Sequence, residues 1–195
     1  MSEECDHTAS LELLMDLEEA EEFDRLLEVA VPLAEGLEQR GSVEDLKAMV
    51  KIRGMIMKAL ALTDREDELL KLFESDYSKY AVHADDEVMY WTHSAAISSA
   101  DSYWVAGNTK RAVELLQFAY EKFRGNPRPA MRMLALRAAI DLAICIYDGG
   151  DPHGAITELE KLMAEFEGDD AENVREEYHR AAEERVRMIR AAGSA

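Results

Sequence analysis

The sequence predicts an all-α protein, an α-solenoid in which antiparallel helix pairs repeat along the chain. Apolar residues recur at spacings of three and four throughout, which is the period of an amphipathic helix. No run alternates Val, Ile or Thr with polar residues, and no Asn-Gly turn joins two such runs, so strands are not expected. The hydrophobic pattern also returns every 43 residues, which indicates internal repeats.

The repeat is clearest in the second helix of each copy. Steps of 43 residues bring Leu26, Leu69, Ala112 and Ala155 into register. The aligned apolar positions of one copy lie at spacings of 1, 3 and 7, so they share one helical face. The matching positions of the first helices are Leu14, Met57, Ala100 and Ala143. Each copy therefore contains two helices, and neighbouring copies stack.

Glycine, proline and capping residues mark the helix ends. AGNTK (106–110) and DGGDPHG (148–154) stand at the same place in successive copies, with Gly ending one helix and Asn or Asp capping the next. RGSVED (40–45) and RGNPRP (124–129) separate copies. The expected helices cover residues 8–20, 22–39, 43–62, 65–80, 86–105, 109–124, 128–147, 153–167 and 171–191. We expect a single domain over residues 1–195, with repeats at about 1–40, 41–82, 83–125 and 126–168 and a capping helix at 171–191.

The two later copies resemble tetratricopeptide (TPR) repeats. In GNTKRAVELLQFAYEKF (107–123) and GDPHGAITELEKLMAEF (150–166), Ala112 and Ala155 stand where the family has its second-helix alanine. The copies exceed the usual 34 residues and are similar in length to the extended repeats of bacterial regulatory helical proteins. The resemblance implies a TPR-like superhelix that is capped by the last helix. It also implies that the first helices line a concave groove for an extended peptide or a partner helix.

The stretch YWTHSAAISSADSYW (90–104) is then the first helix of the third copy, and its small residues indicate close packing. Basic and aromatic residues collect on the predicted groove face of the first helices, although the chain is strongly acidic. When each first helix is plotted at 100° per residue, one stripe faces this groove, and nine residues of these stripes are the expected partner contacts. They are Lys47, Lys51, Lys58, Tyr90, Ser94, Asp101, Trp104, Arg137 and Tyr147.

Other interpretations of these residues stay open. The three lysines would instead be solvated, or would pair with residues 1–46, which hold fifteen acids against two arginines. The aromatic side chains would instead pack between successive first helices. Some TPR domains clamp a peptide's C-terminal carboxylate, and by position Lys51, Lys58 and Arg137 correspond to that clamp. Its paired asparagines are missing here.

The net charge of −19 argues against nucleic acid and anionic membranes as partners, because phosphate groups would be repelled. The chain begins without a basic and apolar leader, and it has no run of about 18 apolar residues. We therefore expect a cytoplasmic protein with no membrane contact, in which Cys5 and Cys145 are reduced thiols.

No catalytic motif with a known spacing is found. ECDH (4–7) and EEYH (176–179) offer too few ligands in the right arrangement for a metal, so neither a metal nor another cofactor is expected. The sequence therefore favours a non-enzymatic protein–protein interaction module, an adaptor, scaffold or co-chaperone-like protein. Its partner would be another protein or peptide that is acidic or has a free C-terminal carboxylate. The alternative is a regulatory sensor whose solenoid changes curvature when it binds a signalling peptide or small ligand. A homodimer through the last helix is also left open.

Overall fold

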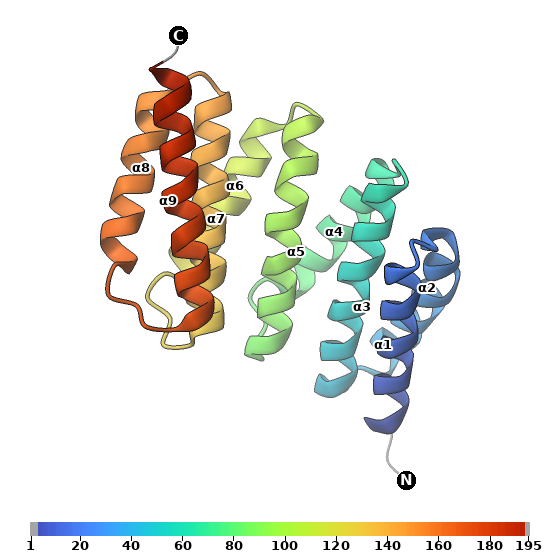
Figure 1. Ribbon diagram of the computed structural model, residues 1–195. Helices are drawn as coiled ribbons and strands as arrows, with labels where there is room; N and C mark the ends of the chain where they lie inside the picture. The colour runs from blue at the N-terminus through green and yellow to red at the C-terminus, as the bar shows by residue number, and fades with distance from the viewer. Residues whose placement is uncertain (1–3, 194–195) are drawn as a thin grey trace. The chain divides into compact units, whose positions relative to one another are not determined.

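The computed structural model describes the backbone of residues 4–193 and the side chains of residues 9–193. Within this part of the chain there are nine α-helices and no strands (Figure 1). The helices are α1 (Glu4–Glu19), α2 (Phe23–Arg40), α3 (Val43–Leu62), α4 (Glu66–Tyr80), α5 (Asp86–Val105), α6 (Thr109–Phe123), α7 (Pro129–Asp148), α8 (Pro152–Phe166) and α9 (Glu172–Ala192). The all-α prediction is confirmed. Every predicted helix end lies within one residue of the observed end except the start of α1, which begins earlier. The side chains of Cys5 and His7 lie outside the described residues.

The chain forms two compact units, Met1–Ser102 and Tyr103–Ala195. In the first unit, α3 packs against α2 and α4, and α1 packs against α2 and α3. In the second unit, α7 packs against α6, α8 and α9, and α8 also packs against α9. The boundary between the units falls in the last turn of α5. The expectation of a single domain over residues 1–195 stays a prediction.

The positions that repeat every 43 residues form the cores of the units. Their side chains are all buried, and they comprise Leu26, Leu69, Ala112 and Ala155 from the second helices and Leu14, Met57, Ala100 and Ala143 from the first helices. Alanine occurs at half of these positions, where a larger side chain would hold two helices apart. The hydrophobic face that predicts each helix is therefore also the face that joins it to its neighbours.

The predicted turns end and start helices through defined contacts. Gly107 and Gly150 occupy equivalent places in two copies, and both have positive φ angles (77° and 94°), which a glycine adopts without strain. The side chain of Asp151 then accepts a hydrogen bond from the backbone N–H of Gly154, with a distance of 2.8 Å. Asn108 caps α6 in the same way, through the N–H of Arg111. These local signals explain why the sequence predicts the ends of the helices so closely.

A buried group of charges holds α3 against α2 and α4 in the first unit. Arg53 of α3 is only 7% exposed, and its guanidinium pairs with the buried Asp76 of α4. The other end of the guanidinium lies 2.5 Å from a carboxylate oxygen of Glu38 in α2. Glu38 also accepts hydrogen bonds from Lys79, at 2.7 Å, and from the hydroxyl of Tyr80, at 3.1 Å. One arginine therefore connects three helices.

This group should make the stability of the first unit depend on pH. Burial raises the pKa of Asp76 to about 6 from an ordinary value of 3.8, although Arg53 acts to lower it. Between these two values the folded chain keeps a proton that the unfolded chain has released. The free energy of unfolding should therefore fall as the pH rises through this window, by roughly 3 kcal/mol. Glu38 behaves in the opposite way. The hydrogen bond from Lys79 lowers the pKa of Glu38 to about 2 against the effect of burial. The contribution of Glu38 to the free energy of unfolding is therefore lost as the pH falls below 4.5.

We expect urea unfolding of the first unit to require more denaturant at pH 5 than at pH 7. The chain has two tryptophans, one in each unit, so Trp91 fluorescence in a Trp104→Phe background reports on the first unit alone. The matched variant is Asp76→Asn, which removes the titrating group and should flatten the dependence between pH 5 and 7. If the stability of both proteins changes equally between pH 5 and 7, Asp76 is not the cause of the pH dependence.

Candidate functional site

A pocket of about 390 Å³ opens between α3 and α5 in the first unit. Its apolar walls come from side chains of three helices, namely Met55, Met57, Leu62, Leu69 and Trp91. The space exists because the facing residues are small. Gly54 and Ala61 lie on α3, and Ser94, Ala95 and Ser98 lie on α5. A Cβ atom added to Gly54 would meet nothing within 4 Å, so this glycine opens directly onto free space.

Two lysines of α3 line the pocket together with its apolar walls. Lys51 and Lys58 are seven residues apart, which places them two helical turns apart on the same side of α3. The ammonium group of Lys51 lies 2.6 Å from a carboxylate oxygen of Glu87 and 5.6 Å from the ring centroid of Trp91. Lys58 pairs with Glu18 of α1. The side chains of Lys51 and Lys58 are 32% and 60% exposed, so both pairs remain in contact with solvent.

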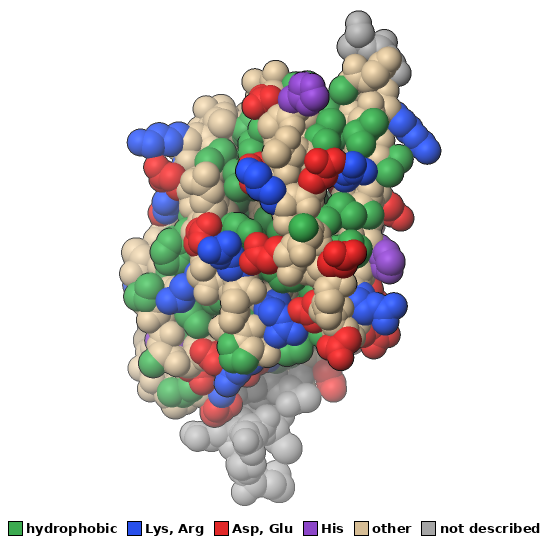
Figure 2. Space-filling view, turned by 90° about the vertical axis from the view of Figure 1, so that its left-hand side faces the viewer, with side chains coloured by type: hydrophobic (Ala, Val, Ile, Leu, Met, Phe, Trp, Pro, Cys, Tyr) green, Lys and Arg blue, Asp and Glu red, His purple; other side chains and the backbone are tan. Residues whose placement is uncertain are grey.

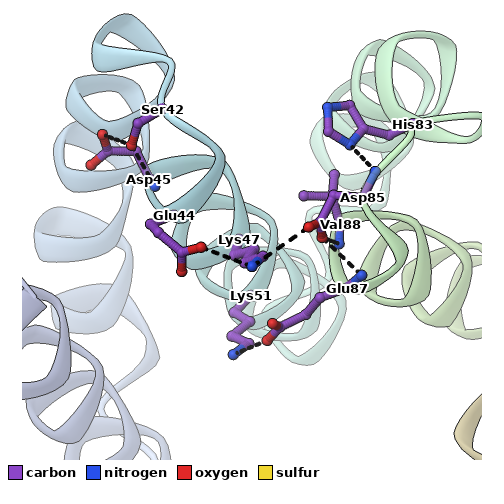
Figure 3. Close-up of polar contacts among 9 residues, drawn as sticks. All are labelled: Ser42, Glu44, Asp45, Lys47, Lys51, His83, Asp85, Glu87 and Val88. Atoms are coloured by element: carbon purple, nitrogen blue, oxygen red, sulfur yellow. Dashed lines mark hydrogen bonds and ion pairs between the residues drawn. The ribbon is translucent and has the colours of Figure 1, made fainter.

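A third lysine, Lys47, lies one turn before Lys51 in a cluster with the start of α5 (Figure 3). Its ammonium group lies 2.8 Å from Glu44 and 3.5 Å from Asp85. The hydrogen bond to Glu44, together with Asp85, raises the pKa of Lys47. Asp85 caps α5 by accepting hydrogen bonds from the backbone N–H groups of Glu87 and Val88. Burial acts to raise the pKa of Asp85, but these N–H groups and Lys47 lower it overall. Asp85 is therefore a negative group that joins α3 to α5.

The structure brings together only some of the predicted contact residues of the first unit. Lys51, Lys58 and Ser94 line the pocket, and Lys47 lies beside them. Tyr90 is half-buried, with its ring edge against Trp91 at 5.2 Å between centroids, and it is not among the lining residues. Asp101 is exposed near the far end of α5. The alternative interpretation of the lysines also has support, because Lys58 pairs with an acid of the first copy.

The three predicted contact residues of the second unit have contacts within that unit. Arg137 of α7 lies 2.5 Å from the carboxylate of Glu177 in α9, which is only 7% exposed. The half-buried ring of Tyr147 lies beneath the guanidinium of Arg187, 6.0 Å from it. The ring of Trp104 lies close to Gly149, where an added Cβ would come within 4.0 Å. The sequence predicts that all nine residues line one groove, and this stays a prediction.

Trp91 was missed by the sequence reasoning, although it supplies an aromatic wall of the pocket and contacts Lys51. The signal was present in the spacing, because Trp91, Ser94 and Ser98 follow one another at three and four residues. The predicted contact residues of this helix start at Tyr90 instead of Trp91. That choice corresponds to a rotation of α5 about its axis by about 100°. The sequence reasoning did not identify Glu87 as the partner of Lys51, and it did not single out Glu18 among the acids of residues 1–46 as the partner of Lys58.

The described residues contain no group of three or more His, Cys, Asp or Glu side chains placed to hold a metal ion. In the same part of the chain, no helix combines the length and apolar character that crossing a membrane requires.

Comparison with solved structures finds two similar crystal structures of the same repeats. The first is a crystal structure of a point variant of "nearly identical TPR-like repeats" from a Podosopora anserina protein described as a kinesin light chain. It matches with a TM-score of 0.64 and 13% identity, over 100% of this chain and 96% of that chain. This chain has the TPR-like repeat fold. A second crystal structure of these repeats gives a TM-score of 0.62 and 14% identity, over 98% of this chain and 96% of the other.

The comparison with solved structures confirms the resemblance to TPR repeats that the later copies predict. At these identities the similarity is one of fold alone. Comparisons with protein-family profiles and with curated proteins gave no match. The similarity therefore assigns no role to individual residues of this chain.

Proposed function

We propose that this TPR-like repeat chain is a non-enzymatic protein-interaction module, and that the pocket between α3 and α5 binds an acidic peptide segment. One apolar side chain of the peptide would enter the pocket, and its carboxylates would bind Lys51 and Lys58. In a cell such a module would act as a cytoplasmic adaptor or scaffold, or as a co-chaperone-like protein.

One observation carries this proposal, namely an apolar pocket lined by two lysines that are paired with the chain's own carboxylates. In a chain of net charge −19, Lys51 and Lys58 are two cations beside an apolar cavity. Glu87 and Glu18 occupy the places that the carboxylates of a ligand would take. Exposed ion pairs of this kind contribute only about 0–1 kcal/mol each, so a ligand can replace them at little cost.

The apolar part of the pocket supplies the affinity. Methionine side chains adapt to differently shaped ligands, and a tryptophan offers a large rigid surface. Met55, Met57 and Trp91 line the same cavity as the two lysines. Charge-assisted hydrogen bonds from the lysines would then fix the direction and register of the peptide. A wider groove stays a prediction. It would also include Lys47, Tyr90, Asp101, Trp104, Arg137 and Tyr147.

The test separates the pocket from the general charge of the protein. Binding is measured by fluorescence anisotropy with labelled nine-residue peptides that place Met, Leu or Phe between Asp and Glu residues, each with a free or amidated C-terminus. Gly54→Leu should fill the cavity and weaken binding at least tenfold. Gly36→Leu is the matched control, because Gly36 is also a helical glycine whose added Cβ would meet nothing within 4 Å. Lys51→Glu/Lys58→Glu should abolish binding.

Two results would contradict the proposal. One is equal binding of the acidic peptides by wild type and Gly54→Leu. The other is a failure of these peptides to bind better than versions with Lys and Arg in place of the acids. Arg137 is left unchanged in this test, because its pair with the buried Glu177 would make its loss a stability effect. Small-angle scattering with and without peptide addresses the alternative of a sensor, for which the profile should change on binding.

A further inference from the structure

The last helix, α9, repeats the register of α7. Steps of 43 residues carry Ile140 to Glu183 and Ala143 to Val186. On α7 these two positions are fully buried, and α7 packs against α6, α8 and α9. On α9 both positions are exposed, and among the described helices α9 packs against α7 and α8 alone. Within the described residues, a face that is covered on α7 is thus open on α9.

The open face of α9 has an apolar seam with charges along its edge. Ala182, Val186 and Ile189 follow at spacings of four and three, and Val186 and Ile189 are each 41% exposed. A shallow hollow of about 790 Å³ runs along the helix here. Glu183 and Arg190, seven residues apart, lie on the same edge of the seam and both line this hollow. Figure 2 shows the side of the molecule on which α8 lies in Figure 1. Acidic, basic and hydrophobic side chains are interspersed on that side.

We infer that this face binds the same face of α9 in a second copy of the chain, with the two helices antiparallel. A two-fold axis near Val186 places Glu183 of each copy opposite Arg190 of the other, which gives two identical charge pairs. The apolar seams of the two helices then meet between these pairs. Such an interface is isologous and closes at two copies. A parallel two-fold arrangement would place the charged edges of the two helices on opposite sides of the seam, so it would form no such pairs.

The antiparallel arrangement also agrees with the fold, in which consecutive helices pack antiparallel. The charge pairs lie at the rim, so they fix register and orientation more than they add affinity. A single helix face buries less than the roughly 800 Å² per partner of a standard stable interface, so a weak, concentration-dependent dimer is expected. The inference does not depend on the pocket between α3 and α5.

Sedimentation velocity of the full chain over a wide range of concentration tests this. Wild type should pass from monomer to dimer as the concentration rises through the micromolar range. Glu183→Arg and Arg190→Glu should each weaken dimerisation at least tenfold. The double variant Glu183→Arg/Arg190→Glu should restore it, because the swapped charges again face each other. Glu167→Arg makes the same charge change at the exposed end of α8 and should have no effect.

Ile189→Asp places a charge in the seam itself and should leave the chain monomeric with unchanged helical circular dichroism. A wild type that stays monomeric at several hundred micromolar would overturn the inference. A double charge-swap variant that remains as weak as the single variants would also overturn it. A dimer that survives Ile189→Asp would show that the copies meet elsewhere.

Discussion

Replacement of Arg53 by methionine should lower the free energy of unfolding of the first unit by about 3–5 kcal/mol. Methionine keeps most of the length and apolar volume of the side chain, so the loss comes from the charge. Without the guanidinium, Asp76 is left as a buried acid without this partner, and Glu38 loses one of its hydrogen bonds. Urea unfolding followed by Trp91 fluorescence in the Trp104→Phe background measures the effect. The variant should also shift the pKa of Asp76 further upward and so steepen the loss of stability above pH 6.

The control is the double variant Arg53→Met/Asp76→Leu, which replaces the buried pair with two apolar side chains. Replacement of a whole buried ion pair is often neutral or stabilising, because the desolvation of both charges is avoided. The double variant should therefore recover most of the stability that Arg53→Met loses. If Arg53→Met lowers the free energy of unfolding by less than about 1 kcal/mol, Arg53 stabilises the unit no more than an exposed ion pair would. If the double variant is as unstable as the single one, the loss lies in packing and not in charge.

The second large effect is expected from Phe123→Ala in the second unit. Phe123 is fully buried at the end of α6, and truncation of a buried phenylalanine typically costs about 3–5 kcal/mol because a cavity remains. Phe118 on the same helix is 43% exposed, so Phe118→Ala is a matched control that should cost about 1 kcal/mol or less. Both are measured by urea unfolding with Trp104 fluorescence in a Trp91→Phe background. Equal losses in the two variants would mean that α6 does not contribute its buried face to a cooperative core.

The helices and the core could be predicted from the sequence because their signals are local or repeated. Most turns contain a glycine, a proline or a capping residue, as at Gly150 and Asp151, so their positions do not depend on the rest of the fold. The positions in steps of 43 residues share one environment, and the same apolar residue types return there. Among the helix ends, the error was confined to the start of α1, where the sequence offers no strong capping signal.

The site was predicted less completely, because its geometry depends on the rotation of single helices and on contacts between distant residues. A rotation of α5 by one residue decides whether Tyr90 or Trp91 faces the pocket, and small residues around the helix leave that rotation undetermined in the sequence. The partner of Lys58 is Glu18, 40 residues earlier, and one of many acids that the sequence offers equally. The buried pair of Arg53 and Asp76 spans 23 residues and lies among charges that otherwise belong to solvent-exposed faces.

The carboxylates that pair with Lys51 and Lys58 have a consequence for which ligands can occupy the pocket. Glu87 and Glu18 are tethered competitors, and a tethered group acts at an effective concentration on the order of millimolar. If the pocket binds ligands as proposed, a metabolite with one carboxylate would exchange with only one of these carboxylates and would gain little, because each exposed pair contributes only about 0–1 kcal/mol. A chain that presents two carboxylates about 10 Å apart, the rise of seven helical residues, would displace both in one binding event. On the proposed function, Glu87 and Glu18 would therefore favour a ligand with two matching negative charges over a monovalent anion.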